Sequence, residues 1–285
     1  MSKQKTLDLL TRLRLKLSQT KYQAFDLMLE KHWIASGDYT RFVVLTRARS
    51  GSNLLVDALH HHPDVIAYNE VLHISGGIIW GEPFPALHTT PDFLRLRTKE
   101  PAVFLEKVIF RQYPAWIKAV GFKLHQSHLR RNAGVKEWLE DCTNLKIIHL
   151  VRRNRLASLV SARIALIEKQ WISKSDNNKY RKNTRITLDH EQCLQVFKAF
   201  QEDMEDYERL LASHNCLKVY YEDICDNFQE ELNEVQSFLA LKPRKLETTN
   251  RKIRVKPLFE IIENYEELKK GFQGTPYAEY FDDIH

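Results

Sequence analysis

The sequence predicts an α/β fold of three layers, with a mostly parallel central sheet flanked by helices. Short apolar runs alternate along the chain with longer amphipathic stretches, which is the pattern of parallel strands joined by crossover helices. At 285 residues, one such sheet can bury a sizeable core within a single domain. Ligands of sheets built in this way bind at the carboxyl ends of the strands. The informative motifs should therefore follow the apolar runs.

Five apolar runs are predicted as strands because they are short and rich in β-branched and aromatic residues. They are Phe42–Thr46, Val65–Tyr68, Val120–Leu124, Lys146–Val151 and Lys218–Tyr221. Helices are expected after most of these strands, where apolar residues recur at helical spacing. A long helix is expected over His190–Ser213.

Two segments depart from this alternation. Residues 1–40 are predicted to be an N-terminal extension of basic amphipathic helix, because their leucines lie among lysines and arginines. Residues 41–285 are expected to form the single α/β domain. Within it, residues 73–118 interrupt the pattern, since five of the nine prolines lie between His73 and Pro114. We expect this stretch to be an insert or a lid beside the site.

An anion site is predicted in the loop that follows the first strand. Residues 47–53, Arg-Ala-Arg-Ser-Gly-Ser-Asn, join an apolar run to an amphipathic helix. Backbone N–H groups and the helix dipole attract an anion to such a helix N-terminus. The loop has neither the Gly-Lys-Ser/Thr of a Walker A loop nor the Gly-x-Gly-x-x-Gly of a dinucleotide site. The candidate phosphate ligands are Arg47, Arg49, Ser50, Gly51, Ser52 and Asn53.

A second basic corner follows the predicted strand Lys146–Val151. The span 146–163 holds five Lys and Arg residues and no acid, and Asn154 is suited to cap the next helix.

In this order, the two corners resemble the motifs of the sulfotransferases that use 3′-phosphoadenosine 5′-phosphosulfate (PAPS). The resemblance runs from Arg41 to the C-terminus and is, in appearance, toward the bacterial carbohydrate and lipopolysaccharide sulfotransferases. It implies the P-loop-like form of the fold, with the first loop on the 5′-phosphosulfate. The family's 3′-phosphate site is an arginine at a strand end and a serine eight positions later, and Arg153 and Ser161 have that spacing. A guanidinium and a hydroxyl placed in this way can converge on one phosphate. Arg155 departs from the family pattern, which usually has proline there. A late basic loop of the family closes over the 3′-phosphate, and the candidates for it are Arg251, Lys252 and Lys256.

The resemblance also implies the chemistry of the site. An acceptor hydroxyl attacks sulfur in line and a nucleoside bisphosphate leaves, so the reaction needs cationic donors and a general base. Arg49 is the candidate for stabilising the leaving group, and Lys123 is the candidate for binding the sulfuryl group. Two residues compete as the base. Glu70, as in the bacterial carbohydrate enzymes, is favoured over His125, as in the cytosolic small-molecule enzymes.

We expect burial to raise the pKa of the Glu70 carboxylate toward the working pH, so that either group is chemically competent as the base. The chemistry needs no metal, and no His, Asp or Glu cluster in the sequence argues for one. The expected acceptor is a carbohydrate, a glycolipid or another hydroxylated metabolite, with residues 73–118 on its side of the site. The expected product is adenosine 3′,5′-bisphosphate (PAP).

Composition limits the partners and the compartment. No run approaches 18 apolar residues, so no transmembrane segment is expected and the chain should be cytoplasmic. The four cysteines match neither a redox pair nor a zinc site and are expected to be reduced thiols. No nucleic acid partner is expected. Peripheral membrane contact and homo-oligomers stay open.

Two other functions remain open from the sequence. A kinase-like phosphotransferase would share the fold, but the chain lacks the Gly-Lys-Ser/Thr motif and an obvious magnesium-binding acid at a strand tip. A non-catalytic polyanion or nucleotide binder would use the net charge of +6, which is concentrated in the segments 146–163 and 242–256. The binder should hold long polyanions in a salt-sensitive way, whereas the transferase should prefer the compact bisphosphate.

Overall fold

The computed structural model describes residues 33–73, 91–168, 184–248 and 256–282, together with residues 24 and 27–31. At its centre is a five-stranded sheet in the order β2-β3-β1-β4-β5, and each pairing is parallel. The predicted α/β class with a parallel sheet is therefore confirmed. The strands are β1 Thr40–Thr46, β2 Val65–Tyr68, β3 Ala119–His125, β4 Lys146–Val151 and β5 Asn215–Tyr220.

Helices and short helical turns connect the strands and follow the last one. Between β1 and β3 they are α2 Ser52–His60, α3 Pro91–Lys99, α4 Pro101–Phe104 and the π-helical turn η2 Leu105–Ile109. Between β3 and β5 they are α5 Gln126–Arg131, α6 Ala133–Asp141, α7 Arg155–Glu168 and α8 His190–Leu211. After β5 they are α9 Tyr221–Asp226, α10 Phe228–Phe238, α11 Leu258–Ile261, α12 Tyr265–Gly271 and the 3₁₀ turn η4 Ala278–Phe281.

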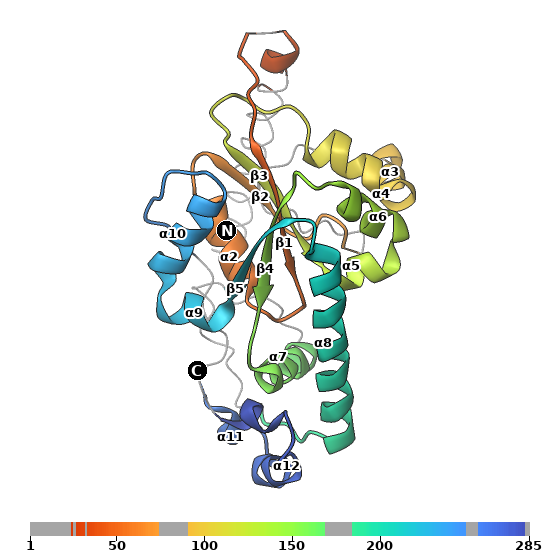
Figure 1. Cartoon of the computed structure of the whole chain (residues 1–285), viewed down its shortest axis with the longest axis vertical. Coiled ribbons are helices and arrows are strands. Elements are labelled where there is room, and N and C mark those ends of the chain that lie inside the picture. Colours follow the sequence, from red (N-terminus) through yellow and green to blue (C-terminus); the bar gives the residue numbers. More distant parts are fainter. Residues whose placement is uncertain are drawn as a thin grey trace, which may run out of the picture.

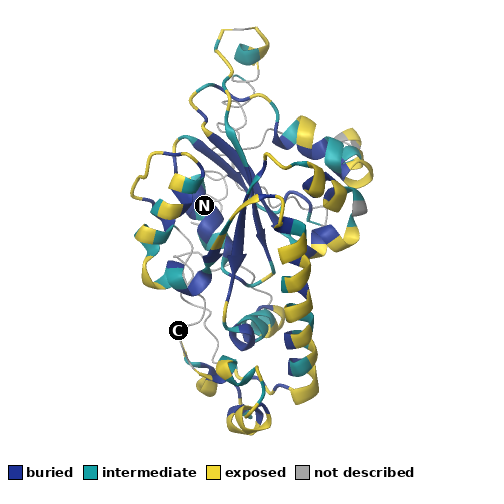
Figure 2. Cartoon of the chain, viewed as in Figure 1, coloured by how far each residue is buried: buried dark blue, intermediate teal, exposed yellow. Residues whose placement is uncertain are grey.

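Alternate residues of β1 face two different helical layers. Val43 and Leu45 belong to the cluster that contains Phe104 of α4 and Tyr207 of α8, whereas Phe42 and Val44 pack with α2 and α10. Because side chains alternate across a strand, a strand that is buried on both faces must be apolar throughout. In Figure 1, α2, α9 and α10 lie on one side of the sheet and α3 to α6 with α8 on the other. Figure 2 shows the buried sheet between helices whose outer surfaces are exposed.

A third cluster lies beyond the carboxyl ends of the strands. There α7, the start of α8 and the C-terminal helices pack around Leu156, Phe197, Leu258 and Phe272, and Figure 1 shows these elements past the arrowheads. The loops that carry the predicted motifs therefore lie between the sheet and this cluster.

The structure agrees with the predicted strands to within a few residues, and the long helix ends at Leu211 rather than at Ser213. All four cysteines are free thiols. The described part of the 73–118 stretch forms α3, α4 and η2, and its buried residues Phe104, Leu105 and Ile109 pack into the core beside the sheet. Its role as a lid stays a prediction. Residues 1–23 of the predicted extension and residues 74–90 lie outside the described residues.

Among the described helices, none is both long enough and apolar enough to cross a membrane.

Candidate active site

The loop after β1 is shaped by two residues with left-handed backbone. Arg49 has φ 67° and Gly51 has φ 84°. A Cβ on Gly51 would overlap the ring of Tyr221. Two independent features therefore require glycine at this position: the left-handed backbone and the close packing of the Tyr221 ring. The result is a tight turn that leads directly into the N-terminus of α2 at Ser52.

Arg49 joins the two predicted motifs. Its Nε donates a hydrogen bond to Ser161 Oγ at 3.0 Å, although 112 residues separate them in the chain. Its carbonyl oxygen accepts a hydrogen bond from Arg152 at 3.2 Å. Burial lowers the pKa of Arg49, and the nearby charge of Arg152 lowers it further. An anionic ligand would stabilise Arg49, because the guanidinium is buried and has a second positive charge beside it.

Arg153 does not meet Ser161 in this conformation. Its two terminal nitrogens donate to the two carboxylate oxygens of Asp223 at 2.5 and 2.7 Å, and its guanidinium lies 3.9 Å from the ring centroid of Tyr220. To bind a phosphate together with Ser161, Arg153 would have to leave Asp223. The shared phosphate site of these two residues therefore stays a prediction.

Asn154 caps α7 as expected, since its Oδ1 accepts the backbone N–H of Ala157 at 2.7 Å. Glu222, which follows β5, accepts the backbone N–H groups of Arg153 and Asn154 at 3.0 and 3.2 Å. Tyr221, Glu222 and Asp223, which follow β5, contact Gly51, the 153–154 backbone and Arg153 in turn. The sequence signal for these contacts was the run of polar residues directly after β5, the strand that pairs with β4.

Lys123, at the end of β3, is only 1% exposed and connects two parts of the site. Its Nζ lies 2.9 Å from Glu70 Oε1 and donates a hydrogen bond to Asn53 Oδ1 at 2.6 Å. Burial lowers the pKa of this lysine, and the carboxylate of Glu70 partly offsets that effect. The ammonium thus links the loop after β1 with the turn after β2.

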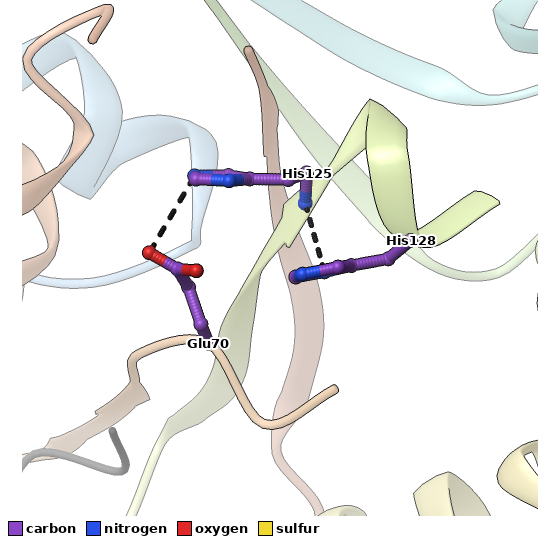
Figure 3. A group of neighbouring side chains, drawn as sticks. All are labelled: Glu70, His125 and His128. Carbon is purple, nitrogen blue, oxygen red and sulfur yellow. Dashed lines mark hydrogen bonds and ion pairs between the residues drawn. The ribbon is translucent and has the colours of Figure 1, made fainter. Parts of the chain in front are cut away.

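Glu70, His125 and His128 form a cluster at the ends of β2 and β3 (Figure 3). His125 Nε2 points toward Glu70 Oε1 at 3.8 Å and makes no hydrogen bond with the described residues. The two imidazole rings are stacked with centroids 5.4 Å apart, and His128 Nδ1 accepts the backbone N–H of His125 at 3.3 Å. The structure therefore brings both candidate bases to one point beside Lys123.

The expectation that burial raises the pKa of Glu70 is wrong for this site. Burial alone would raise it, but the ammonium of Lys123, followed by His125, lowers it more, and the resulting pKa lies below the usual value. Burial and then Lys123 lower the pKa of His125 to about 3. At neutral pH the carboxylate is charged and the imidazole is neutral, so either group can accept a proton.

The sequence did not indicate a metal cluster, yet the structure brings one possible set of ligands together. The ligand atoms of Glu70, His125 and His128 lie within 4.8 Å of one another. Spacing along the chain could not reveal this set, because the residues come from two segments that meet only through the pairing of β2 with β3. The ammonium of Lys123 already forms an ion pair with the carboxylate of Glu70. A metal ion would have to compete with that charge.

Three contacts made by charged residues of the site were not foreseen. Asp203 of α8 is fully buried and forms ion pairs with Arg47 Nη1 at 2.7 Å and with Arg130 of α5. Arg155 is buried against Phe200 of α8. Of the predicted late basic loop, Lys256 is exposed, and Arg251 and Lys252 lie outside the described residues.

Comparisons with known proteins agree with these features. The model of the sulfotransferase family matches residues 42–244, and the chain belongs to this family. Nodulation protein H of Rhizobium tropici is 27% identical over 245 residues, which cover 85% of this chain and 92% of that protein. Nodulation protein H of Rhizobium meliloti is 26% identical over 247 residues, which cover 85% and 94%.

Two solved structures are similar at lower identity. A sulfotransferase from Alicyclobacillus acidocaldarius is 15% identical with a TM-score of 0.48, and the match covers 86% of this chain and 95% of that one. Mouse sulfotransferase SULT7A1, complexed with PAP, is 12% identical with a TM-score of 0.45, and the match covers 86% and 89%. At these values the likeness carries no information about individual site residues.

Proposed function

We propose that the chain transfers a sulfuryl group from PAPS to a hydroxyl group of a carbohydrate, a glycolipid or another hydroxylated metabolite. One observation carries the proposal. The buried ammonium of Lys123 contacts both Asn53, in the predicted donor loop, and Glu70, the favoured base. Group transfer requires the donor and the acceptor to be held next to each other. The ammonium of Lys123 joins the loop proposed to bind the donor to the residue proposed to activate the acceptor.

The residues of the loop after β1 fit a phosphosulfate. The left-handed turn at Arg49 and Gly51 leaves no room for a side chain at Gly51 and leads into a helix N-terminus, where backbone N–H groups favour an anion. Arg49 supplies a buried positive charge beside the turn. Bound PAPS would supply the activated sulfuryl group and the bisphosphate leaving group.

Glu70 is the better supported base. Its carboxylate is ionised at neutral pH because Lys123 holds its pKa low. Any anion that draws the Lys123 ammonium away from Glu70 would raise the pKa of that carboxylate and make it a stronger base. His125, whose pKa is about 3, is a weak proton acceptor, and its Nε2 lies 3.8 Å from Glu70 Oε1.

The first test is the binding of PAP, measured by calorimetry in magnesium-free buffer, with ATP as the competing ligand. The wild type should bind PAP, and Arg153→Ala should weaken binding by at least about tenfold, because charge-assisted bonds to phosphate contribute roughly 1.5–3 kcal/mol. Arg163→Ala is the matched control, since Arg163 is an exposed arginine of α7 that bonds to Gln192. It should bind PAP as the wild type does. Absence of PAP binding, together with ATP binding that appears when magnesium is added in a second titration, would reject the proposal.

The second test separates the two candidate bases. With labelled PAPS and an acceptor found by screening, Glu70→Gln should lower kcat by about 10²- to 10⁴-fold, the usual contribution of a general base. His125→Asn should lower it less. The opposite order would assign the base to His125, and PAP affinity near the wild-type value would show that both variants keep the donor site.

A further inference from the structure

Three potential metal ligands meet where β2 and β3 end, and the proposed transfer reaction accounts for only two of them. The ligand atoms of Glu70, His125 and His128 lie within 4.8 Å of one another (Figure 3). Two imidazoles and one carboxylate are a ligand set that suits divalent transition metals such as Zn²⁺. The transfer reaction gives no role to His128, which is only 3% exposed.

His125 has an imidazole nitrogen without a hydrogen-bond partner. Its Nε2 is buried, points toward Glu70 Oε1 at 3.8 Å and makes no hydrogen bond within the described part of the chain. A buried polar nitrogen left in this way costs about 1–3 kcal/mol, which a ligand would recover. Because burial keeps the pKa of His125 at about 3, the ring is neutral at neutral pH, the form that binds metals.

His128 can exchange a weak hydrogen bond for an ion. Its Nδ1 accepts the backbone N–H of His125 at 3.3 Å, which is long for such a bond. A neutral imidazole has one nitrogen lone pair, so binding an ion through either nitrogen gives up this hydrogen bond. The rings of His125 and His128 are stacked at 15° and must turn to direct both lone pairs at one ion. Zn²⁺ bonds of about 2.0–2.1 Å place tetrahedral ligand atoms about 3.3 Å apart, so these side chains close by no more than about 1.5 Å.

Lys123 competes for Glu70, but the ammonium has a second partner. Its Nζ lies 2.9 Å from Glu70 Oε1 and donates a hydrogen bond to Asn53 Oδ1 at 2.6 Å. An ion on Glu70 would repel the ammonium toward the Asn53 oxygen that it already contacts. On the other side of the carboxylate, His73 Nε2 lies 3.9 Å from Glu70 Oε2 and adds a third imidazole beside the cluster.

We propose that Glu70, His125 and His128 bind a divalent transition metal ion such as Zn²⁺, and that the bound ion inhibits group transfer. The metal site follows from the geometry of these three side chains, whereas the inhibition rests on the proposed function. The ion would occupy the carboxylate of the favoured base, so that Glu70 could not accept the proton of the acceptor hydroxyl. Three protein ligands leave the fourth position of a tetrahedral ion to water.

The site is tested by titrating Zn²⁺ into the full chain by calorimetry, in a buffer without chelators or other divalent metals. The wild type should bind Zn²⁺, and His128→Asn should weaken this binding at least about tenfold, because losing even a hydrogen-bond partner of a metal ligand typically costs about 10- to 100-fold in affinity. The asparagine oxygen takes the place of Nδ1 and can still accept the N–H of His125.

His61→Asn is the matched control, because it removes an exposed imidazole just after α2. It should leave Zn²⁺ affinity unchanged. Any Zn²⁺ held by the four free thiols is common to the wild type and both variants. No Zn²⁺ binding by the wild type, or equal affinity in His128→Asn, would overturn the proposal.

A second variant protects the test against misfolding. If near-ultraviolet circular dichroism shows that His128→Asn has lost its tertiary structure, His125→Asn decides, since Nε2 of His125 makes no hydrogen bond with a described residue that this change would break. Zn²⁺ affinity should fall by a similar factor. Unchanged affinity in a folded His125→Asn variant would count against the metal site.

Transfer from labelled PAPS then tests the inhibition. Half of the wild-type rate should be lost near the Zn²⁺ concentration that half-saturates the site, and His128→Asn should need at least about tenfold more, each protein being compared with its own zinc-free rate. Zn²⁺ that fills the site without slowing transfer would reject the inhibition. The two proposals fail separately: zinc binding that depends on His128, in a protein that transfers no sulfuryl group, would retain the metal site and reject the proposed function, whereas transfer without zinc binding would do the reverse.

Discussion

At the scale of single residues, Gly51 has the most sharply defined requirement in the site. Gly51→Ala should destabilise the chain by about 2–5 kcal/mol, since a non-glycine residue with left-handed backbone costs roughly 1–2 kcal/mol and a forced ring shift of Tyr221 adds about 1–3 kcal/mol. Urea denaturation measures the change, and calorimetry should show weaker PAP binding.

Gly134→Ala is the control. Its Cβ meets no atom within 4 Å and should change stability by less than about 1 kcal/mol, in the stabilising direction. Similar losses in both variants would contradict this account.

The sequence identified the basic residues of the site but not the partner of each one. Arg153 and Arg155 flank Asn154 and look equivalent in the printed chain. In the structure, Arg153 pairs with Asp223 at the surface and Arg155 lies buried on Phe200. These partners come from β5–α9 and α8, so only the assembled fold decides which guanidinium points inward. The same reason hid the proximity of His128 to Glu70.

At the scale of elements, α8 connects the two sides of the site through Asp203. The carboxylate pairs with Arg47 after β1 and with Arg130 of α5, and it is fully buried. Asp203→Asn should cost about 3 kcal/mol, because removing one partner of a buried ion pair leaves the other charge unpaired. Urea denaturation measures the loss, and amide hydrogen exchange should become faster in α5 and in residues 47–50.

Asp206→Asn is the control for this prediction. Asp206 lies on the same helix and pairs with Arg209, but both side chains are largely exposed. Such a pair contributes about 0–1 kcal/mol, so this variant should stay close to the wild type. A loss as large in Asp206→Asn as in Asp203→Asn would show that burial does not decide the effect.

The strands were predictable from the sequence because a strand covered on both faces must be apolar along its length. β1 and β4 are buried almost throughout, and their predicted bounds agree closely with the structure. β5 is the exception, since it begins at Asn215 and not at Lys218. It lies at the edge of the sheet, and its first residues are exposed or half-buried, so no apolar run marks its start.

At the scale of the whole molecule, stability should fall on acidification because several histidines are buried in the neutral form. Burial lowers the pKa of His149 from 6.5 to about 4, and that of His128 likewise to about 4. Each imidazole binds a proton more readily in the unfolded chain. Its contribution is therefore complete above pH 6.5 and is lost as the pH falls through 6.5 toward 4.

His149→Phe should make stability less dependent on pH while keeping a ring against Tyr207. The loss of stability between pH 7 and pH 4 should shrink by up to about 3 kcal/mol, since one pKa unit corresponds to about 1.4 kcal/mol. Chemical denaturation at a series of pH values measures the difference. His61→Phe, at an exposed residue after α2, should leave the pH dependence as it is in the wild type. An unchanged slope in His149→Phe would contradict the assignment.

The order of the strands has an evolutionary consequence. β1 stands at the centre, the candidate donor residues follow β1 and β4, and the candidate base residues follow β2 and β3. On the proposed function, mutations that alter acceptor preference fall in segments on one side of the central strand, and those that alter donor binding fall on the other. Acceptor preference can therefore change during evolution while the residues that bind the donor stay the same. Lys123 contacts residues of both groups and should be retained in either case.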